Sequence, residues 1–196
     1  TNNLINSLIQ KENKPKWLFF SSTSHVYKPL DKFKKISEKS KLDPGSKYGK
    51  TKLLAEKLIL KKLKKYPIKV CIGRIFSFTD KKQKEPFVIP SIKKKLKNSK
   101  KKIVFKNLNH FRDFLNTDDI ISAIYILMKT SKSGIFNIGS GKKFDLRKIV
   151  KLFNKNNKDI IFKNTEKPTY LISNNNKLLK TKWRPSKFKN NIKYFY

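Results

Sequence analysis

The sequence predicts an α/β fold built on a mainly parallel β-sheet that helices cover on both faces. Short apolar runs rich in β-branched and aromatic residues recur along the chain, as buried strands require. Between them lie stretches whose leucines and isoleucines return at helical spacing. Strands that alternate with helices are joined by crossovers, which give parallel pairing and a helical layer on each face.

Five apolar runs are predicted as strands. They are Trp17 to Phe20, Val70 to Arg74, Ile103 to Phe105, Ile135 to Ile138 and Ile160 to Phe162. Charged or polar residues interrupt every apolar run well below the length of a membrane span, so the sequence predicts no membrane partner.

Four amphipathic stretches are predicted as helices. They run from Leu4 to Ile9, from Leu53 to Leu63, from Ile120 to Leu127, and from Asp145 to Phe153. Asn116 and Thr117 are good caps for the third helix, and Asp145 can cap the fourth. Pro67 stops the second helix, because a proline in a helix interior removes a hydrogen bond and clashes with the preceding turn.

The charge of the chain is extreme. Its 196 residues carry a formal charge of +36, from 49 Lys+Arg against 13 Asp+Glu. Such a balance suggests a polyanion such as RNA or lipopolysaccharide as a partner. All but four of the basic residues are lysines, however, and they are scattered over every predicted element. A nucleic-acid partner is therefore the second hypothesis, behind a general drift of surface positions to lysine.

Cysteine and histidine are scarce. Cys71 is the single cysteine and the chain has two histidines, so we expect no disulfide, no zinc centre and a cytoplasmic location. No signal-peptide pattern follows Thr1. Because Met128 is the single methionine, Thr1 is not a translational start, which indicates a processed chain or a fragment.

Tyr48 and Lys52 lie four residues apart at the start of the second helix, so both side chains project from one face. A phenol is a weak base at neutral pH, and an adjacent ammonium stabilises its phenolate form. The pair could therefore move protons. Tyr125 and Lys129 have the same spacing in this lysine-rich chain, so the spacing alone proves nothing.

The surroundings of Tyr48 are more informative. The first strand ends in the hydroxyl-rich run Phe20-Ser21-Ser22-Thr23-Ser24-His25-Val26-Tyr27, and Asp43-Pro44 leads into the tyrosine helix, which continues to Glu56. In open α/β sheets, the carboxyl ends of the strands are where ligands bind.

Further motifs follow in order along the whole chain. They are Arg74 at the end of the next strand, Phe87-Val88-Ile89-Pro90, His110-Phe111-Arg112-Asp113-Phe114 with Asp118-Asp119, Phe136-Asn137-Ile138-Gly139 and Trp183-Arg184-Pro185. With these motifs the sequence resembles the extended short-chain dehydrogenase/reductases, in particular the NAD-dependent epimerase/dehydratase family of nucleotide-sugar enzymes. The resemblance implies the later part of a Rossmann-like doubly wound parallel sheet plus a small C-terminal substrate-binding α/β portion.

The resemblance also implies roles for single residues. Tyr48 would exchange a proton with the sugar, Thr23 would hydrogen-bond the reacting oxygen, and Lys52 would hold the nicotinamide ribose and stabilise the phenolate. Without Tyr48, Thr23 would be interpreted as a strand-end hydroxyl that satisfies a backbone group.

Cofactor and substrate contacts follow from the same likeness. The NAD or NADP contacts would be Ser21, Ser22, Tyr48, Lys52 and Ile75, and the sugar-nucleotide contacts would be Ser24, His25, Ser77 and Arg112. Arg112 would clamp the diphosphate with its planar fork, and the competing interpretation is a surface ion pair with Asp113 or Asp118.

The sequence departs from the family at the dinucleotide site. Six glycines are present, and none forms the Gly-rich loop that would cover a pyrophosphate. The likeness therefore implies that the first half of the enzyme is missing and that this chain alone binds cofactor poorly. We expect residues 1–80 to complete the Rossmann-like domain, and residues 81–196 to form mainly the substrate portion with some segments returning to the sheet.

Other departures concern the substrate. Ser77 stands where the family leads one to expect asparagine, and Lys167-Pro168 stands where a late arginine is expected. Ser24-His25 replaces the Asp-Glu pair that the 4,6-dehydratase branch uses to eliminate water. This last difference ranks a 4-keto reductase or a 4-epimerase of an NDP-(deoxy)sugar above a dehydratase. The resemblance also implies a role in cell-surface polysaccharide biosynthesis.

Two alternatives stay open. One is a basic module that binds RNA or lipopolysaccharide, and the other is an inactive fragment or split subunit of the same family. The likeness further implies a homodimer when the enzyme is complete.

Overall fold

The computed structural model describes residues 1–99 and 101–186 and shows an α/β fold with parallel sheets, as predicted. The strands are β1 (Trp17–Thr23), β2 (Lys69–Ile75), β3 (Ser77–Thr79), β4 (Lys102–Lys106), β5 (Phe111–Arg112), β6 (Phe114–Asn116), β7 (Gly134–Ile138), β8 (Phe144–Asp145), β9 (Asp159–Lys163) and β10 (Tyr170–Leu171). The helices are α1 (Asn2–Gln10), the 3₁₀ turn Ser24–Val26, α2 (Lys47–Leu63), α3 (Val88–Asn98), α4 (Thr117–Lys129), α5 (Leu146–Phe153) and α6 (Asn176–Leu179).

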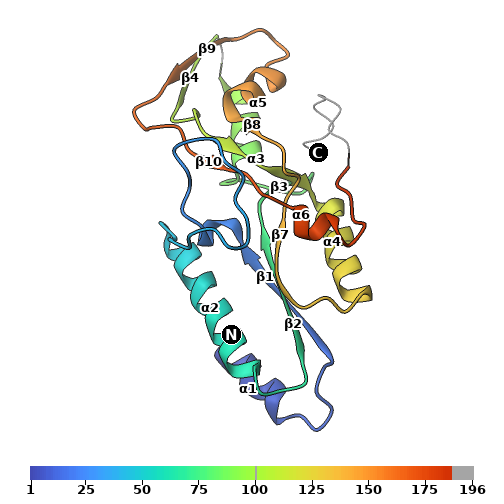
Figure 1. Cartoon of the computed structure of the whole chain (residues 1–196). Helices are drawn as coiled ribbons and strands as arrows, with labels where there is room; N and C mark the ends of the chain where they lie inside the picture. Colours follow the sequence, from blue (N-terminus) through green and yellow to red (C-terminus); the bar gives the residue numbers. More distant parts are fainter. Residues whose placement is uncertain (100, 187–196) are drawn as a thin grey trace.

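The main sheet has the order β1-β2-β7, and all three strands are parallel (Figure 1). β1 forms one edge of this sheet. Its first four residues, Trp17 to Phe20, are only half-buried although all four are large and apolar. At the other end of the strand pair, Thr23 lies opposite Ile75, so the carboxyl ends of β1 and β2 coincide.

Helices cover both faces of this sheet, as the alternation of elements predicts. On one face, Leu18, Phe20 and Val70 pack into a core with α1 and α2, through buried residues such as Ile59. On the other face, Cys71 packs with α4 residues such as Leu127. Successive residues of the strands thus point to opposite layers, which is the period of two that strands impose.

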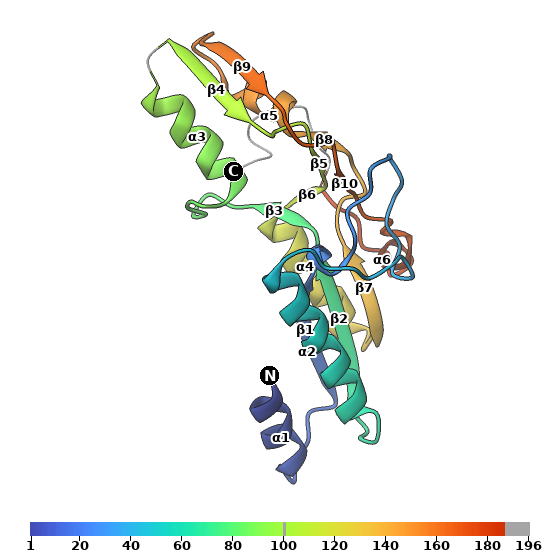
Figure 2. The same cartoon turned by 90° about the vertical axis from the view of Figure 1, so that its left-hand side faces the viewer.

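Two of the five predicted strands pair outside the main sheet. β4 and β9 contain the predicted segments and pair in parallel with each other, far from β1 (Figure 2). They belong to a separate core with α3 and α5, built around Ile103, Phe105 and Ile149. Apolar periodicity shows that a strand is buried but not which strand it pairs with.

Helix α3 is not predicted by the sequence patterns, because its lysines obscure the buried series Ile89, Ile92 and Leu96.

The helix caps at Asn116 and Asp145 were predicted correctly. The Asn116 side chain accepts a hydrogen bond from the amide of Asp119 at 2.7 Å, and the Asp145 side chain accepts one from the amide of Arg147 at 2.9 Å. The described helices are too short or too polar to cross a membrane. The division at residue 80 stays a prediction.

The first turn of α2 packs directly on the 3₁₀ turn that follows β1. Ser46 caps α2 by accepting a hydrogen bond from the amide of Gly49 at 3.0 Å. A Cβ atom at Gly49 would lie 2.3 Å from the backbone oxygen of His25 and 2.9 Å from the Cβ of Pro44. Only glycine allows this approach, which brings the start of α2 against the end of β1.

We therefore predict that Gly49→Ala destabilises the fold. Alanine favours a helix over glycine by up to about 1 kcal/mol, but overpacking against a fixed backbone costs roughly 1–3 kcal/mol, so the net change is a loss. Urea denaturation of the variant measures it. Gly45→Ala is the matched control, since a Cβ there meets nothing within 4 Å. A Gly49→Ala protein as stable as the control would contradict the packing argument.

Candidate active site

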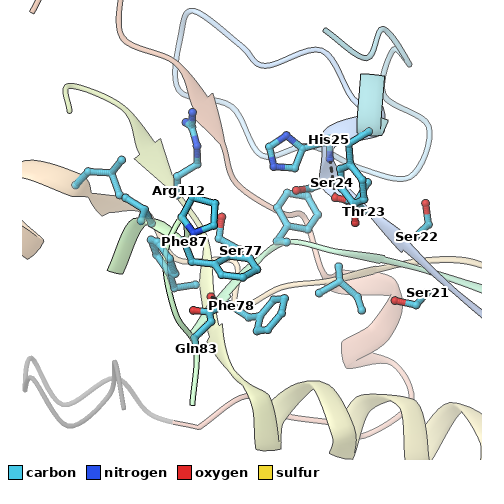
Figure 3. A pocket seen from close by; sticks show the side chains of 17 residues that line it. Ser21, Ser22, Thr23, Ser24, His25, Ser77, Phe78, Gln83, Phe87 and Arg112 are labelled. Carbon is cyan, nitrogen blue, oxygen red and sulfur yellow. Dashed lines mark hydrogen bonds between the residues drawn. The ribbon is translucent and has the colours of Figure 1, made fainter. Parts of the chain in front are cut away.

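A cavity of about 660 Å³ opens at the carboxyl ends of β1 and β2, where the main sheet meets the smaller α/β portion (Figure 3). The residues that line it are Ser21, Ser22, Thr23, Ser24, His25, Tyr48, Ile75, Phe76, Ser77, Phe78, Gln83, Pro86, Phe87, Val88, Arg112, Phe114 and Leu146. Nine of the ten site residues expected from the sequence are among them, and Lys52 is the tenth. Residues far apart in the sequence therefore meet at one place.

The last two residues of β1, Ser22 and Thr23, supply hydroxyls with different surroundings. The Ser22 hydroxyl donates to the carboxylate of Glu56, away from any ligand role. Thr23 is buried, and its Oγ1 accepts a hydrogen bond from the amide of His25 at 3.3 Å. This is the backbone contact that the structural interpretation of Thr23 requires, but it leaves the hydroxyl hydrogen for donation to another acceptor.

Tyr48 and Lys52 share one face of α2. Tyr48 lines the cavity with 56% of its surface exposed. The Lys52 ammonium lies 5.9 Å from the centre of the Tyr48 ring and donates to the backbone oxygen of Ser21 at 2.7 Å. Lys52 is thus fixed between the tyrosine and the strand end, which distinguishes it from an ordinary solvated lysine.

His25 stands beside Tyr48 at the rim of the cavity. The two rings meet edge to face, with centres 6.3 Å apart and planes at 68°. Although part of the imidazole stays exposed, burial of the rest lowers the pKa of His25 below its usual value of 6.5, and the charge of Arg112 lowers it further. The imidazole is therefore neutral near pH 7.

Arg112 reaches the cavity from β5, on the side opposite Ser21 and Ser22 of β1 (Figure 3). Its Nη1 donates to the backbone oxygens of Phe111 and Thr169 at 2.8 and 3.1 Å. Burial lowers the pKa of Arg112 to about 10, so the guanidinium remains charged at neutral pH. Within the described part of the chain it has no carboxylate partner, and the cavity wall contains no carboxylate.

The competing interpretation of Arg112, an ion pair with a neighbouring aspartate, is wrong for Asp113. The Asp113 carboxylate is fully buried and accepts hydrogen bonds from Ser140, Gly141 and Ser173. Burial raises the pKa of Asp113, and these donors oppose the shift. Asp113 and Arg112 are adjacent in an extended segment, so their side chains point to opposite sides, and Asp113 anchors the backbone from which Arg112 projects.

The apolar wall of the cavity, formed by Phe78 and Phe87, was not predicted from the sequence. Phe78 and Phe87 are 37% and 52% exposed, and their ring centres lie 6.5 Å apart. Both rings and Gln83 lie along one side of the cavity (Figure 3). The motif from Phe87 to Pro90 was the signal in the sequence for this part of the wall. That its aromatic ring is exposed to the cavity could be learned only from the structure.

Comparison with known proteins shows to which family the chain belongs. The model of the family described as GDP-mannose 4,6 dehydratase matches residues 1–192. The chain belongs to this family. The family lies within the extended short-chain dehydrogenase/reductases that the sequence motifs resemble. Two curated relatives are a UDP-glucose 4-epimerase of Lactobacillus helveticus, 31% identical over 156 residues, and a dTDP-D-glucose 4,6-dehydratase of Dictyostelium discoideum, 32% identical over 105 residues.

The alignments cover 68% of this chain and 47% of the epimerase, and 53% of this chain and 24% of the dehydratase. The chain therefore spans less than half the length of these relatives.

Solved structures show the same fold. The UDP-glucuronic acid 4-epimerase from Bacillus cereus, in complex with UDP-glucuronic acid and NAD, superposes with a TM-score of 0.84 at 23% identity, covering 100% of this chain and 64% of that one. RMD from Pseudomonas aeruginosa, complexed with NADPH, gives 0.79 at 21% identity, covering 88% and 62%. The Rossmann-like architecture is thus confirmed.

We predict that His25 titrates below pH 6.5. The unfolded chain binds the proton near pH 6.5, whereas the folded chain binds it only at lower pH, so stability present at neutral pH is lost as the pH falls through the folded pKa. NMR titration of the two imidazoles gives their midpoints, and Arg112→Gln should move that of His25 upward. A His25 midpoint at or above 6.5, or one unmoved by Arg112→Gln, would contradict the assignment.

Proposed function

We propose that the complete protein is an NAD(P)-dependent nucleotide-sugar enzyme that acts at C4 of its substrate, as a 4-keto reductase or a 4-epimerase. The observation that carries the proposal is the position of Tyr48, which is exposed to the cavity beside the ammonium of Lys52 and across from the end of β1. Family membership and the two relatives named as a nucleotide-sugar epimerase and a dehydratase support it.

Each residue has a distinct task in this proposal. The Tyr48 hydroxyl gives a proton to, or takes it from, the sugar oxygen at C4. The positive charge of Lys52 stabilises the phenolate form of Tyr48 and holds the nicotinamide ribose. The remaining hydroxyl hydrogen of Thr23 is donated to the same sugar oxygen and orients it.

The residues present fit one end of a nicotinamide cofactor. Ser21, Ile75, Tyr48 and Lys52 gather at the carboxyl end of the sheet, where such cofactors bind in open α/β folds. When bound, the cofactor would supply the hydride chemistry at C4 of the sugar. Ser22 contributes to this end through the backbone, because its hydroxyl is directed to Glu56. These 196 residues contain no Gly-rich loop for the pyrophosphate, and the proposal assigns this part of the site to another segment of the complete protein.

The cavity favours C4 chemistry over the removal of water. Elimination needs an acid and a base next to the reacting carbons, and carboxyl groups normally supply them. Ser24 and His25 occupy the positions after Thr23, and none of the lining residues is acidic. This preference stands although the family model and one relative carry the name dehydratase.

The opposite side of the cavity fits the diphosphate of a nucleotide sugar. Arg112 is a half-buried cation without a carboxylate partner among the described residues, and a planar guanidinium binds phosphate oxygens in pairs. Ser24, His25 and Ser77 line the same cavity as Arg112 and Tyr48, and in this proposal they contact the sugar.

We also propose that the complete enzyme is a homodimer that uses the outer face of α2. Leu54 and Leu60 are 67% and 40% exposed on this helix, and Leu58 is half-buried. Apolar side chains on a solvent-facing helix surface are a feature of protein interfaces.

We predict that Tyr48→Phe lowers kcat of the complete enzyme roughly 10²–10⁴-fold, because a general acid–base group is removed. Lys52→Met should lower it as well, and nicotinamide absorbance with a panel of NDP-sugars is the measurement. Tyr125→Phe is the matched control, since Tyr125 is also 56% exposed and also precedes a lysine by four residues. Normal turnover in Tyr48→Phe would refute the proposed function.

A second prediction tests the diphosphate site without turnover. Binding of UDP at Arg112 should neutralise the charge that lowers the pKa of His25, so the NMR midpoint of His25 should rise when UDP is added. In Arg112→Gln the UDP-dependent rise should disappear. A rise of equal size in both proteins would place the diphosphate elsewhere.

A further inference from the structure

Tyr48, Lys52 and Glu56 are spaced by four residues, so they lie along one face of α2. Tyr48 lines the cavity and Lys52 contacts both the Tyr48 ring and the backbone of Ser21, whereas Glu56 is 2% exposed and does not line the cavity. Its position continues the face that carries the proposed proton-transfer pair, one helical turn further from the cavity.

Glu56 has close partners on both neighbouring strands. Its carboxylate accepts a hydrogen bond from the Ser22 hydroxyl of β1. Arg74 of β2 donates to it through Nε, at 3.1 and 3.2 Å to the two oxygens, and through Nη2 at 2.7 Å. Both side chains of the ion pair are 2% exposed.

The contacts continue beyond Arg74 to the rest of the sheet. Its Nη1 donates to the Tyr27 hydroxyl at 2.9 Å, and Tyr27 in turn donates to the side-chain oxygen of Asn137 on β7 at 2.6 Å. Burial lowers the pKa of Arg74, but the bonds to Glu56 and Tyr27 outweigh this and leave it raised. Burial raises the pKa of Tyr27 to about 12, so its hydroxyl keeps the proton that it donates.

Two successive residues of β1 are thereby joined to two successive turns of α2. Lys52 donates to the backbone oxygen of Ser21, and Ser22 donates to Glu56. Thr23 is the next residue of the strand, and Tyr48 is the preceding turn of the helix. The two contacts therefore fix how far along β1 the helix sits, and with it the distance between the hydroxyls of Thr23 and Tyr48.

We propose that Glu56 and Arg74 are positioning residues that hold Tyr48 and Lys52 in register with Thr23 for the proton transfer. This inference rests on the proposed function, because it assigns the pair a task in the same site. Neither residue lines the cavity, so both act through the helix and the strand. The planar fork of Arg74 is essential, since a lysine ammonium cannot reproduce three directed contacts with one carboxylate.

The test uses Arg74→Lys in the complete enzyme with its cofactor. Misplacement of reacting groups by about 1 Å costs up to a hundredfold in rate. We expect kcat to fall ten- to a hundredfold while KM for the nucleotide sugar changes less than about twofold. Arg147→Lys is the matched control, because Arg147 on α5 donates through Nε and Nη2 to the carboxylate of Asp145, the residue that caps that helix, away from α2.

A second readout does not depend on activity. Incorporation of 3-fluorotyrosine gives fluorine signals from the seven tyrosines, and Tyr48→Phe assigns the signal of Tyr48. In Arg74→Lys the Tyr48 signal should shift or broaden, while that of Tyr125 on α4 stays unchanged. If Arg74→Lys does not fold, Ser22→Ala serves instead, because it removes one contact and keeps the ion pair; the same fall in kcat and the same fluorine change are expected.

The outcomes separate the two ideas. A folded Arg74→Lys protein with an unmoved Tyr48 signal and kcat within twofold of the parent would overturn the positioning role, even if Tyr48→Phe abolishes turnover. Equal losses in Arg74→Lys and Arg147→Lys would also overturn it, since they would reflect general destabilisation. Full turnover in Tyr48→Phe would instead overturn the proposed function itself.

Discussion

The buried ion pair between Glu56 and Arg74 is the interaction on which the arrangement of the site depends. Removing two charges from water is costly, and the cost is offset only when the remaining hydrogen-bonding capacity of both groups is met. Here Ser22, Tyr27 and the backbone of Glu38 complete the contacts of the pair. A register shift of α2 along β1 would leave at least one charged group without a partner, so the pair excludes alternative packings more than it adds stability.

The adjacent residues Arg112 and Asp113 organise the part of the cavity wall that β5 supplies. Arg112 and Asp113 have opposite charges and adjacent positions, yet they do not neutralise each other. Asp113 is satisfied by backbone amides and serine hydroxyls, and it holds together three segments that are distant in sequence. Among the described residues, no carboxylate therefore neutralises the guanidinium of Arg112, which lines the cavity. The cavity is therefore lined by the proposed proton-transfer residue Tyr48 and by the cationic Arg112, and a buried carboxylate supports the segment that carries each of them.

Local patterns in the sequence predicted most of the longer helices and strands. Contacts between segments distant in the sequence were harder to predict. The helices with apolar periodicity and capping residues, such as α4 after Asn116, follow from short-range physics. The partner of β4 could not be deduced, because β9 lies more than fifty residues away and pairing leaves no local pattern. The two- and three-residue strands are too short to show any alternation. The expected site residues at the ends of β1 and β2 line the cavity because the strand ends of a parallel sheet meet at one edge. The approach of Arg112 from another sheet and the Glu56–Arg74 contact could not be deduced from the sequence in this way.

For this chain by itself, without the rest of the complete protein, the position of β1 at the edge of the described main sheet affects the behaviour in solution. Its outer row of backbone N–H and C=O groups is a template for another strand, and the half-buried Trp17 to Phe20 add apolar surface to it. The charge of +36 opposes this by repulsion between copies. Repulsion between surface charges is screened over about 8 Å at physiological salt and over less at higher salt. The colloidal stability of the chain on its own is therefore set by ionic strength, with low salt keeping the exposed edges apart and high salt allowing them to meet.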